Sequence, residues 1–186
     1  MMYATAGTNI DGSWRNAIGS EGERVVRTII LQELLHHNEI SSITDRQSKT
    51  SAITDWDESK LLDSIDSVKT LNLTNGYSVL YSSEPDVTLY DDKGSIVCAI
   101  EIKAGLDPAG ALERLGAMLK SFENTLEEYP NAMTILVASC ITPEVEARLG
   151  ASMVVRMKYI LTDITANETN KRKFANRIRK LLKLTK

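Results

Sequence analysis

The chain has 186 residues, of which 42% are hydrophobic and 25% charged, as in ordinary globular proteins. This length allows a sizeable core, and we predict one domain over residues 1–186. The sequence has no run of 18 apolar residues, and its N-terminus lacks a basic segment followed by an apolar one, so we expect a cytoplasmic protein with no membrane span. Cys98 and Cys140 lie within apolar runs, which favours reduced core thiols.

Charge is unevenly distributed along the chain. Residues 171–186 contain eight Lys or Arg and no acidic residue, which leaves 14 basic and 25 acidic residues upstream. A basic amphipathic helix at about residues 171–184 can contact phosphates, a membrane surface or an acidic partner. An equally good interpretation docks its apolar side on the core. The acidic remainder disfavours tight, independent DNA binding.

The first third of the sequence has helical periodicity. The apolar spacing from Ser20 to His37 predicts an amphipathic helix, with Ser20 as its N-cap and Glu23 in the capping-box position. We expect an irregular segment before this helix. The polar residues 38–54 are predicted to form a loop, and residues 55–71 a second, shorter helix.

After an Asn75-Gly76 turn, the period changes to two residues. Three short strands are predicted, YSVLY, DVTLY and SIVCAIEIK, the last two joined as a hairpin through DDKG. A long helix is then expected from Asp107-Pro108 to Pro130, followed by the strand TILVAS, the helix PEVEARLG, the strand SMVVRMKYIL and the basic helix. This order predicts an α/β fold with a mixed central sheet flanked by helices.

Charged residues cluster at the ends of two predicted strands. In SIVCAIEIK, alternation places Glu101 and Lys103 on one face and Cys98, Ile100 and Ile102 on the other. Asp86 begins the preceding strand, so the hairpin brings Asp86 beside Glu101. Ionised groups in such places are costly unless they are paired or bind a cation.

This arrangement suits metal-assisted hydrolysis. Two neighbouring carboxylates repel unless a cation lies between them, and oxygen ligands suit Mg²⁺, with Mn²⁺ able to substitute. The ammonium of Lys103 can orient or activate a water and offset charge on a phosphate oxygen. Asp86, Glu101 and Lys103 therefore indicate attack of water on a phosphodiester. Glu23, near the edge of the apolar stripe of its helix, is either a further ligand or only a capping residue.

A non-catalytic interpretation also fits these residues. Glu-x-Lys is common on solvated strand faces, and Pro-Asp is common in turns. Glu101 and Lys103 would then form a surface ion pair in a non-catalytic interaction module that docks through the C-terminal helix.

Pro85-Asp86 followed by Glu101-Ile102-Lys103, between a helix with a glutamate and a further helix and strand, resembles the PD-(D/E)XK nuclease superfamily. The resemblance covers a core of about residues 20–139. It implies that Asp86 and Glu101 hold a divalent metal, that the Ile102 carbonyl adds a ligand, that Lys103 activates the water, and that Glu23 supports the site.

The segment KAGLDPAGALERLGAMLKSFE, residues 103–123, is similar to the one that follows this motif in type II restriction endonucleases. Short length and an acidic body further resemble the small catalytic subunit of a heterodimeric type IIS restriction endonuclease. That resemblance implies cleavage of one strand of double-stranded DNA once a larger, site-recognising nicking subunit is bound. The rival within the superfamily is a stand-alone repair nuclease or junction resolvase. Arg114 and Lys120, six residues apart on the long helix, are candidate phosphate contacts.

Overall fold

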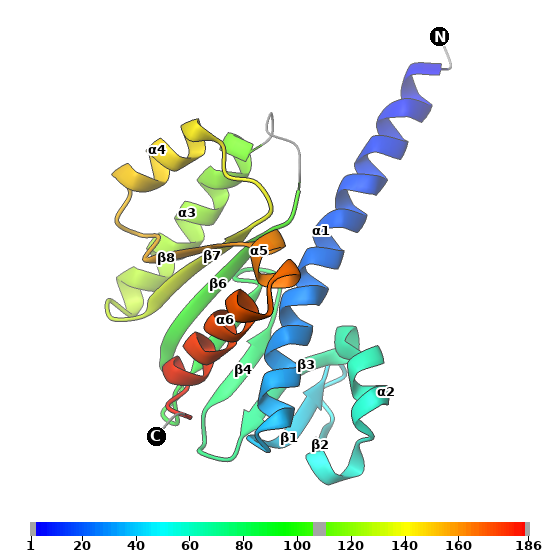
Figure 1. Cartoon of the computed structure of the whole chain (residues 1–186), viewed down its shortest axis with the longest axis vertical. Helices are drawn as coiled ribbons and strands as arrows, with labels where there is room; N and C mark the ends of the chain where they lie inside the picture. The colour runs from blue at the N-terminus through cyan, green and yellow to red at the C-terminus, as the bar shows by residue number, and fades with distance from the viewer. Residues whose placement is uncertain (1–2, 106–110, 185–186) are drawn as a thin grey trace.

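The computed structural model describes residues 3–105 and 111–184, with side chains described for residues 18–105 and 115–184. Its helices pack on both faces of one central sheet (Figure 1). The α-helices are α1 (Tyr3–His36), α2 (Glu58–Asp63), α3 (Ala111–Glu128), α4 (Pro143–Ala151), α5 (Leu161–Ala166) and α6 (Glu168–Leu181). The strands are β1 (Ile40–Asp45), β2 (Thr50–Ala52), β3 (Val68–Leu73), β4 (Ser78–Tyr81), β5 (Val87–Tyr90), β6 (Ile96–Lys103), β7 (Met133–Ala138) and β8 (Met157–Ile160).

The sheet is mixed, with the strand order β2-β1-β3-β4-β5-β6-β7-β8. Neighbouring strands from β2 to β6 are antiparallel, whereas β6, β7 and β8 are parallel. Parallel neighbours need crossover connections, and α3 and α4 provide them. The predicted α/β class, the mixed sheet and the β5–β6 hairpin are therefore confirmed. Gly76 and Gly94, the glycines of the two predicted turns, have positive φ.

Each face of the sheet has its own hydrophobic core. One core joins α1 and α6 to the sheet and contains Cys98, Ile100 and Ile102 of β6. The second lies under α3 and α4 and includes Ala99 of the same strand. Strand β6 is thus buried on both faces, which fits its almost continuous apolar sequence. Any charged side chain on β6 is consequently removed from bulk water unless it lies at the strand end.

The first helix is longer than predicted. α1 begins at Tyr3 and extends past the sheet (Figure 1), so the expected irregular segment is wrong. Ser20 lies in the middle of α1 and is no N-cap, and Glu23 is no capping-box residue. Glycine and asparagine lower the helix propensity of this segment, but it contains no proline that would break a helix. No described helix is long and apolar enough to span a membrane.

The region between α1 and β4 also differs from the prediction. The expected loop over residues 38–54 contains the antiparallel pair β1–β2, and the second helix stops at Asp63, with β3 starting at Val68. β1 and β2 are rich in Ser and Thr and largely half-exposed or exposed, so they lack the apolar alternation that identifies a strand. In β3 the buried residues are Val68, Leu71 and Leu73, whose first spacing is helical.

The basic C-terminal helix α6 docks on the core. Phe174, Ile178 and Leu182 are fully buried or nearly so, which confirms the docking interpretation. Arg179 donates to both oxygens of Glu39, with its Nη2 2.5 Å from Oε1 and its Nε 3.0 Å from Oε2. This bidentate pair fixes α6 beside the start of β1.

Gly22 sets the distance between α1 and the end of β6. A Cβ at Gly22 would lie 2.1 Å from the Cβ of Ala104 and 3.2 Å from Cδ2 of Leu161. No side chain fits there, so α1 packs directly against the residue that follows Lys103. The close approach places Glu23, the next residue on α1, near the end of β6.

We expect Gly22→Ala to destabilise the protein by about 1–3 kcal/mol, because the added methyl group overpacks a closed contact. Gly19→Ala is the matched control, since a Cβ at Gly19 meets nothing within 4 Å, and it should be neutral or stabilising. Denaturant unfolding of both variants measures this. Equal free energies of unfolding for the two would show that Gly22 does not set the α1–β6 distance.

Candidate active site

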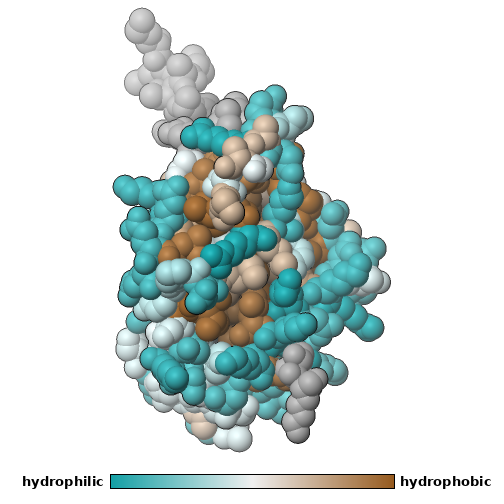
Figure 2. Space-filling model, turned by 90° about the vertical axis from the view of Figure 1, so that its left-hand side faces the viewer, coloured by the Kyte–Doolittle hydropathy of each residue, from teal (hydrophilic) through white to brown (hydrophobic). Residues whose placement is uncertain are grey.

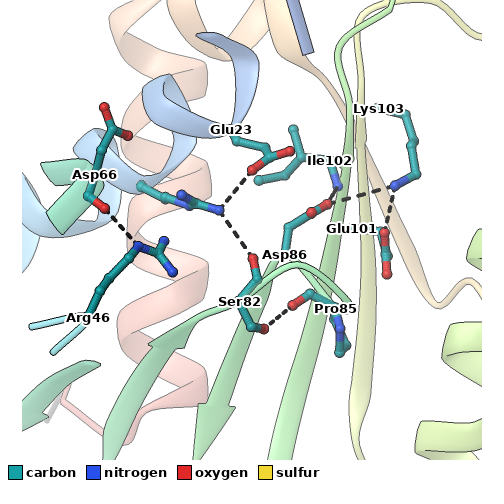
Figure 3. Close-up of polar contacts among 10 residues, drawn as sticks. Glu23, Arg46, Asp66, Ser82, Pro85, Asp86, Glu101, Ile102 and Lys103 are labelled. Carbon is teal, nitrogen blue, oxygen red and sulfur yellow. Dashed lines mark hydrogen bonds and ion pairs between the residues drawn. The ribbon is translucent and has the colours of Figure 1, made fainter. Parts of the chain in front are cut away.

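Asp86 is positioned by a tight turn between β4 and β5. The backbone N–H of Ser82 donates to the Asp86 carbonyl at 3.1 Å, and the Ser82 hydroxyl donates to the carbonyl of Pro85 at 2.5 Å (Figure 3). Antiparallel pairing of Tyr81 with Val87 closes the turn. Asp86 therefore precedes the first residue of β5 in a fixed backbone conformation.

The side chain of Asp86 reaches across to β6. Its Oδ2 accepts the backbone N–H of Ile102 at 2.6 Å, although the β5–β6 pairing ends at Val87 and Ile100. The Asp86 carboxylate thus accepts the hydrogen bond that a backbone carbonyl would accept if the β5–β6 pairing continued beyond Val87. Among the described residues, the Asp86 side chain accepts no other hydrogen bond, so Oδ1 keeps its lone pairs.

Glu101 and Lys103 meet beside Asp86, as the alternation along β6 predicts. Lys103 Nζ lies 2.8 Å from Glu101 Oε2 and 3.9 Å from Asp86 Oδ2. Figure 3 shows the ammonium joined by dashed lines to both carboxylates. Asp86 is 3% and Glu101 2% exposed, so both acids are buried. The second Glu101 oxygen accepts the hydroxyl of Ser121 on α3 at 2.9 Å.

Burial dominates the electrostatics of this cluster. It raises the pKa of Asp86 from 3.8 to about 7, with the Ile102 N–H and Lys103 opposing the rise and Glu101 and Glu23 adding to it. Burial also lowers the pKa of Lys103, but the hydrogen bond and charge of Glu101, with the charges of Asp86 and Glu23, outweigh it and leave that pKa raised. Lys103 is therefore a cation at neutral pH, and one ammonium does not offset two buried carboxylates.

Glu23 lies at the edge of this cluster. It is close enough to influence the pKa of both Asp86 and Lys103, but its Oε2 binds Nη2 of Arg27 at 2.8 Å, one turn along α1. The same Nη2 donates to the Ser82 carbonyl at 3.2 Å. Glu23 thus comes near the two acids from a third element, and Arg27 connects it to the turn that holds Asp86.

The donor set fits a hard divalent cation. Asp86 and Glu101 offer carboxylate oxygens, and the carbonyl of Ile102 points to the same side of β6 as its N–H, beyond the last paired residue of β5. Magnesium and manganese prefer such oxygen ligands. In the part of the chain that the structure describes, however, no three His, Cys, Asp or Glu side chains are grouped closely enough to hold a metal. Glu23 does not complete such a group.

The predicted DNA contacts are Arg114 and Lys120. The side chain of Arg114, like the Asp107-Pro108 helix start, lies outside the described residues, and Lys120 is exposed on α3. Sequence reasoning missed Ser121 and Arg27. Ser121 and Thr125 are buried hydroxyl residues that share the helical spacing of Met118 and Phe122. The sequence signal that could have identified Ser121 was the presence of these polar residues on the apolar stripe of α3.

A small apolar hollow adjoins Lys103 on the side of α3 and α4. It is lined by Lys103, Gly105, Leu115, Met118, Leu136, Ala138, Cys140, Ile141 and Val145. Figure 2 looks onto this side of the molecule, where apolar side chains show between charged ones. Lys103 thus has apolar neighbours on this side.

A family model described as XcyI restriction endonuclease matches residues 1–185 of the chain. No curated protein matches the sequence of this chain.

The raised pKa of Asp86 predicts a pH dependence of stability in metal-free protein. Between about pH 4 and 7 the folded state keeps a proton on Asp86 that the unfolded chain releases, so the contribution of Asp86 to wild-type stability falls as pH rises, by at most about 1.4 kcal/mol per pH unit. Asp86→Asn lacks this dependence. With chelator present, the free energy of unfolding of Asp86→Asn minus that of wild type should therefore increase with pH up to about pH 7 and then stay constant.

Asp92→Asn, at an exposed position of the DDKG turn, serves as the control. A constant difference between Asp86→Asn and wild type across this pH range would contradict the account of Asp86.

Proposed function

Because the chain belongs to the XcyI restriction endonuclease family and is thus a type II site-specific deoxyribonuclease, we propose that Asp86, Glu101 and Lys103 form its catalytic centre and that its cofactor is Mg²⁺. The observation that carries the proposal is the contact of Lys103 with two buried carboxylates at the ends of paired strands. The family makes DNA the substrate.

In this proposal, Asp86, Glu101 and the Ile102 carbonyl hold the metal, which when bound polarises the phosphate and lowers the pKa of its water. Lys103 is a cation at neutral pH, which favours a role in holding the attacking water and offsetting charge on the phosphate oxygens. The water oxygen bonds to phosphorus while the phosphorus–ester oxygen bond breaks. The attacking water loses a proton to solvent and the leaving oxygen takes one up, so the products are a phosphate monoester and an alcohol. Ser121 keeps Glu101 oriented through its hydrogen bond. The negative charge of Glu23, which raises the pKa of Asp86, would favour the bound cation.

We further propose that the chain is the small catalytic subunit of a heterodimeric type IIS enzyme and cuts one strand when a larger, site-recognising subunit is bound. Two features support this role. The segment before residue 171 is strongly acidic, and the described chain forms one sheet with its flanking helices. A partner that reads the DNA sequence would supply the DNA affinity and the site recognition that these two features leave to another protein. A stand-alone nuclease of the same superfamily remains the competing candidate, and the two differ in whether the chain cleaves DNA alone.

Replacing Glu101 by Gln tests the catalytic centre. Glu101→Gln removes a metal-binding charge at nearly constant shape, so cleavage should fall at least about 100-fold, and Mn²⁺ binding measured by calorimetry should weaken. Glu127→Gln, exposed on α3, should leave both unchanged. Assays include the larger subunit wherever cleavage requires it. Full activity and unchanged Mn²⁺ binding in Glu101→Gln would reject this centre.

Mixing experiments test the subunit role. The chain alone should leave duplex DNA intact, and addition of a larger, site-recognising protein, sought among those encoded beside it, should produce Mg²⁺-dependent cuts in both strands. With Glu101→Gln in the mixture, only the strand cut by the partner should be nicked. Double-strand cleavage by the chain alone would contradict the subunit role and leave the catalytic assignment standing.

A further inference from the structure

A groove with a basic lining runs beside the catalytic cluster on the side opposite the apolar hollow. It has a volume of about 530 Å³ and is lined by Glu23, Arg27, Arg46, Lys69, Leu80, Tyr81, Ser82 and Ser83. Glu23 and Ser82 connect the groove to the catalytic cluster. Glu23 influences the pKa of Asp86, and Ser82 holds the turn that precedes Asp86. Whatever occupies the groove is therefore next to the reacting centre.

The groove is positive in an otherwise acidic segment. Arg46 and Lys69 form no ion pair with any carboxylate in the described part of the chain, and the Arg46 Nε donates to the backbone carbonyl of Asp66 at 2.8 Å (Figure 3). The Asp66 carboxylate itself lies 3.7 Å from Arg24. Glu23 is the one acid among the lining residues and is paired with Arg27. Two cationic charges therefore remain uncompensated in the groove.

Arg27 is a fixed donor in the wall of this groove. Its residue is 6% exposed, its Nη2 makes both contacts with Glu23 and Ser82, and its guanidinium lies 5.7 Å from the centre of the Tyr81 ring. Its Nε is buried and has no hydrogen-bond partner in the described structure. A buried charged donor without a partner is costly. Nη1 forms no hydrogen bond with the described residues and is not among the buried unpaired atoms, so it can donate to a ligand while Glu23 stays bound.

Arginine and lysine around a groove are the residues that bind phosphate groups. Contacts to the DNA backbone fix the position of the duplex without reading its sequence. The hydroxyl of Ser83 adds a short polar group of the kind that also contacts backbone phosphates, whereas the hydroxyl of Ser82 already donates to Pro85. The lining thus matches a phosphodiester better than a base edge or an apolar ligand.

We propose that this groove binds a backbone phosphate of the DNA strand that is cut, next to the scissile phosphate, through Arg27, Arg46 and Lys69. The inference rests on the proposed function and adds a specific phosphate site to it. A strand held there has its neighbouring phosphate at the cluster of Asp86, Glu101 and Lys103. The groove thereby supplies the alignment that the catalytic residues need.

Binding to cleavage-deficient protein tests the groove separately from catalysis. In the Glu101→Gln background, with the larger subunit where it is needed, Arg46→Gln and Lys69→Gln should each raise the Kd for duplex DNA about 10-fold at low salt. Each should also reduce the slope of log K against log salt concentration by about 0.9. Arg27 is left intact because its burial would confound folding with binding.

Arg148→Gln on α4 and Lys93→Gln in the DDKG turn, both exposed in the structure, are matched controls that remove the same charges elsewhere. Groove variants that bind DNA like these controls, with the same salt slope, would overturn the groove. Cleavage by the enzyme with Glu101 intact is scored separately, so loss of the groove leaves the proposed function standing. Conversely, weakened binding in the groove variants supports the groove even if the catalytic assignment fails.

Discussion

The hydrogen bond from the Ile102 backbone amide to Asp86 Oδ2 holds the candidate active site together. It extends the β5–β6 ladder by one contact after the backbone pairing has ended, and it uses a carboxylate to do so. Asp86 consequently cannot move away from Glu101 and Lys103 without breaking a buried hydrogen bond. The turn at Ser82 and the close approach of Gly22 to Ala104 fix the two flanks of the same point.

Acidic and basic side chains alternate around this point. Glu101 contacts Lys103, Lys103 lies near Asp86, and Glu23 contacts Arg27, with the groove cations Arg46 and Lys69 beyond. Each acid is thus held near a cation, yet the raised pKa of Asp86 shows that its buried charge is incompletely offset. A divalent cation on one side and a phosphate on the other would complete the balance. The same arrangement therefore explains why this end of the sheet suits both ligands.

The central part of the fold could be predicted from sequence because its residues carry unambiguous local signals. β4 to β7 have apolar runs bounded by Gly, Asn or Pro, and alternation along β6 alone paired Glu101 with Lys103. The position of Asp86 followed from the hairpin. Strands β1 to β3 were missed because their stability comes from pairing within the sheet rather than from apolar side chains. The start of α1 was missed because a weakly helical segment continues a strong helix.

The supporting residues of the site could not be predicted because they depend on tertiary contacts. Ser121 meets Glu101 across twenty residues, and Arg27 meets Ser82 across fifty-five. Gly22 reads as an ordinary helix residue until Ala104 is placed against it. Glu23 was left open between a ligand and a cap, and the continuous helix excludes the cap.

The most direct measurement is a crystal of the protein soaked with Mn²⁺ and examined by anomalous diffraction. The account predicts a peak within coordination distance of the Asp86 and Glu101 carboxylates and the Ile102 carbonyl, with Lys103 displaced from its contact with Glu101. If cleavage requires the metal but the anomalous peak lies elsewhere in the protein, the account is contradicted.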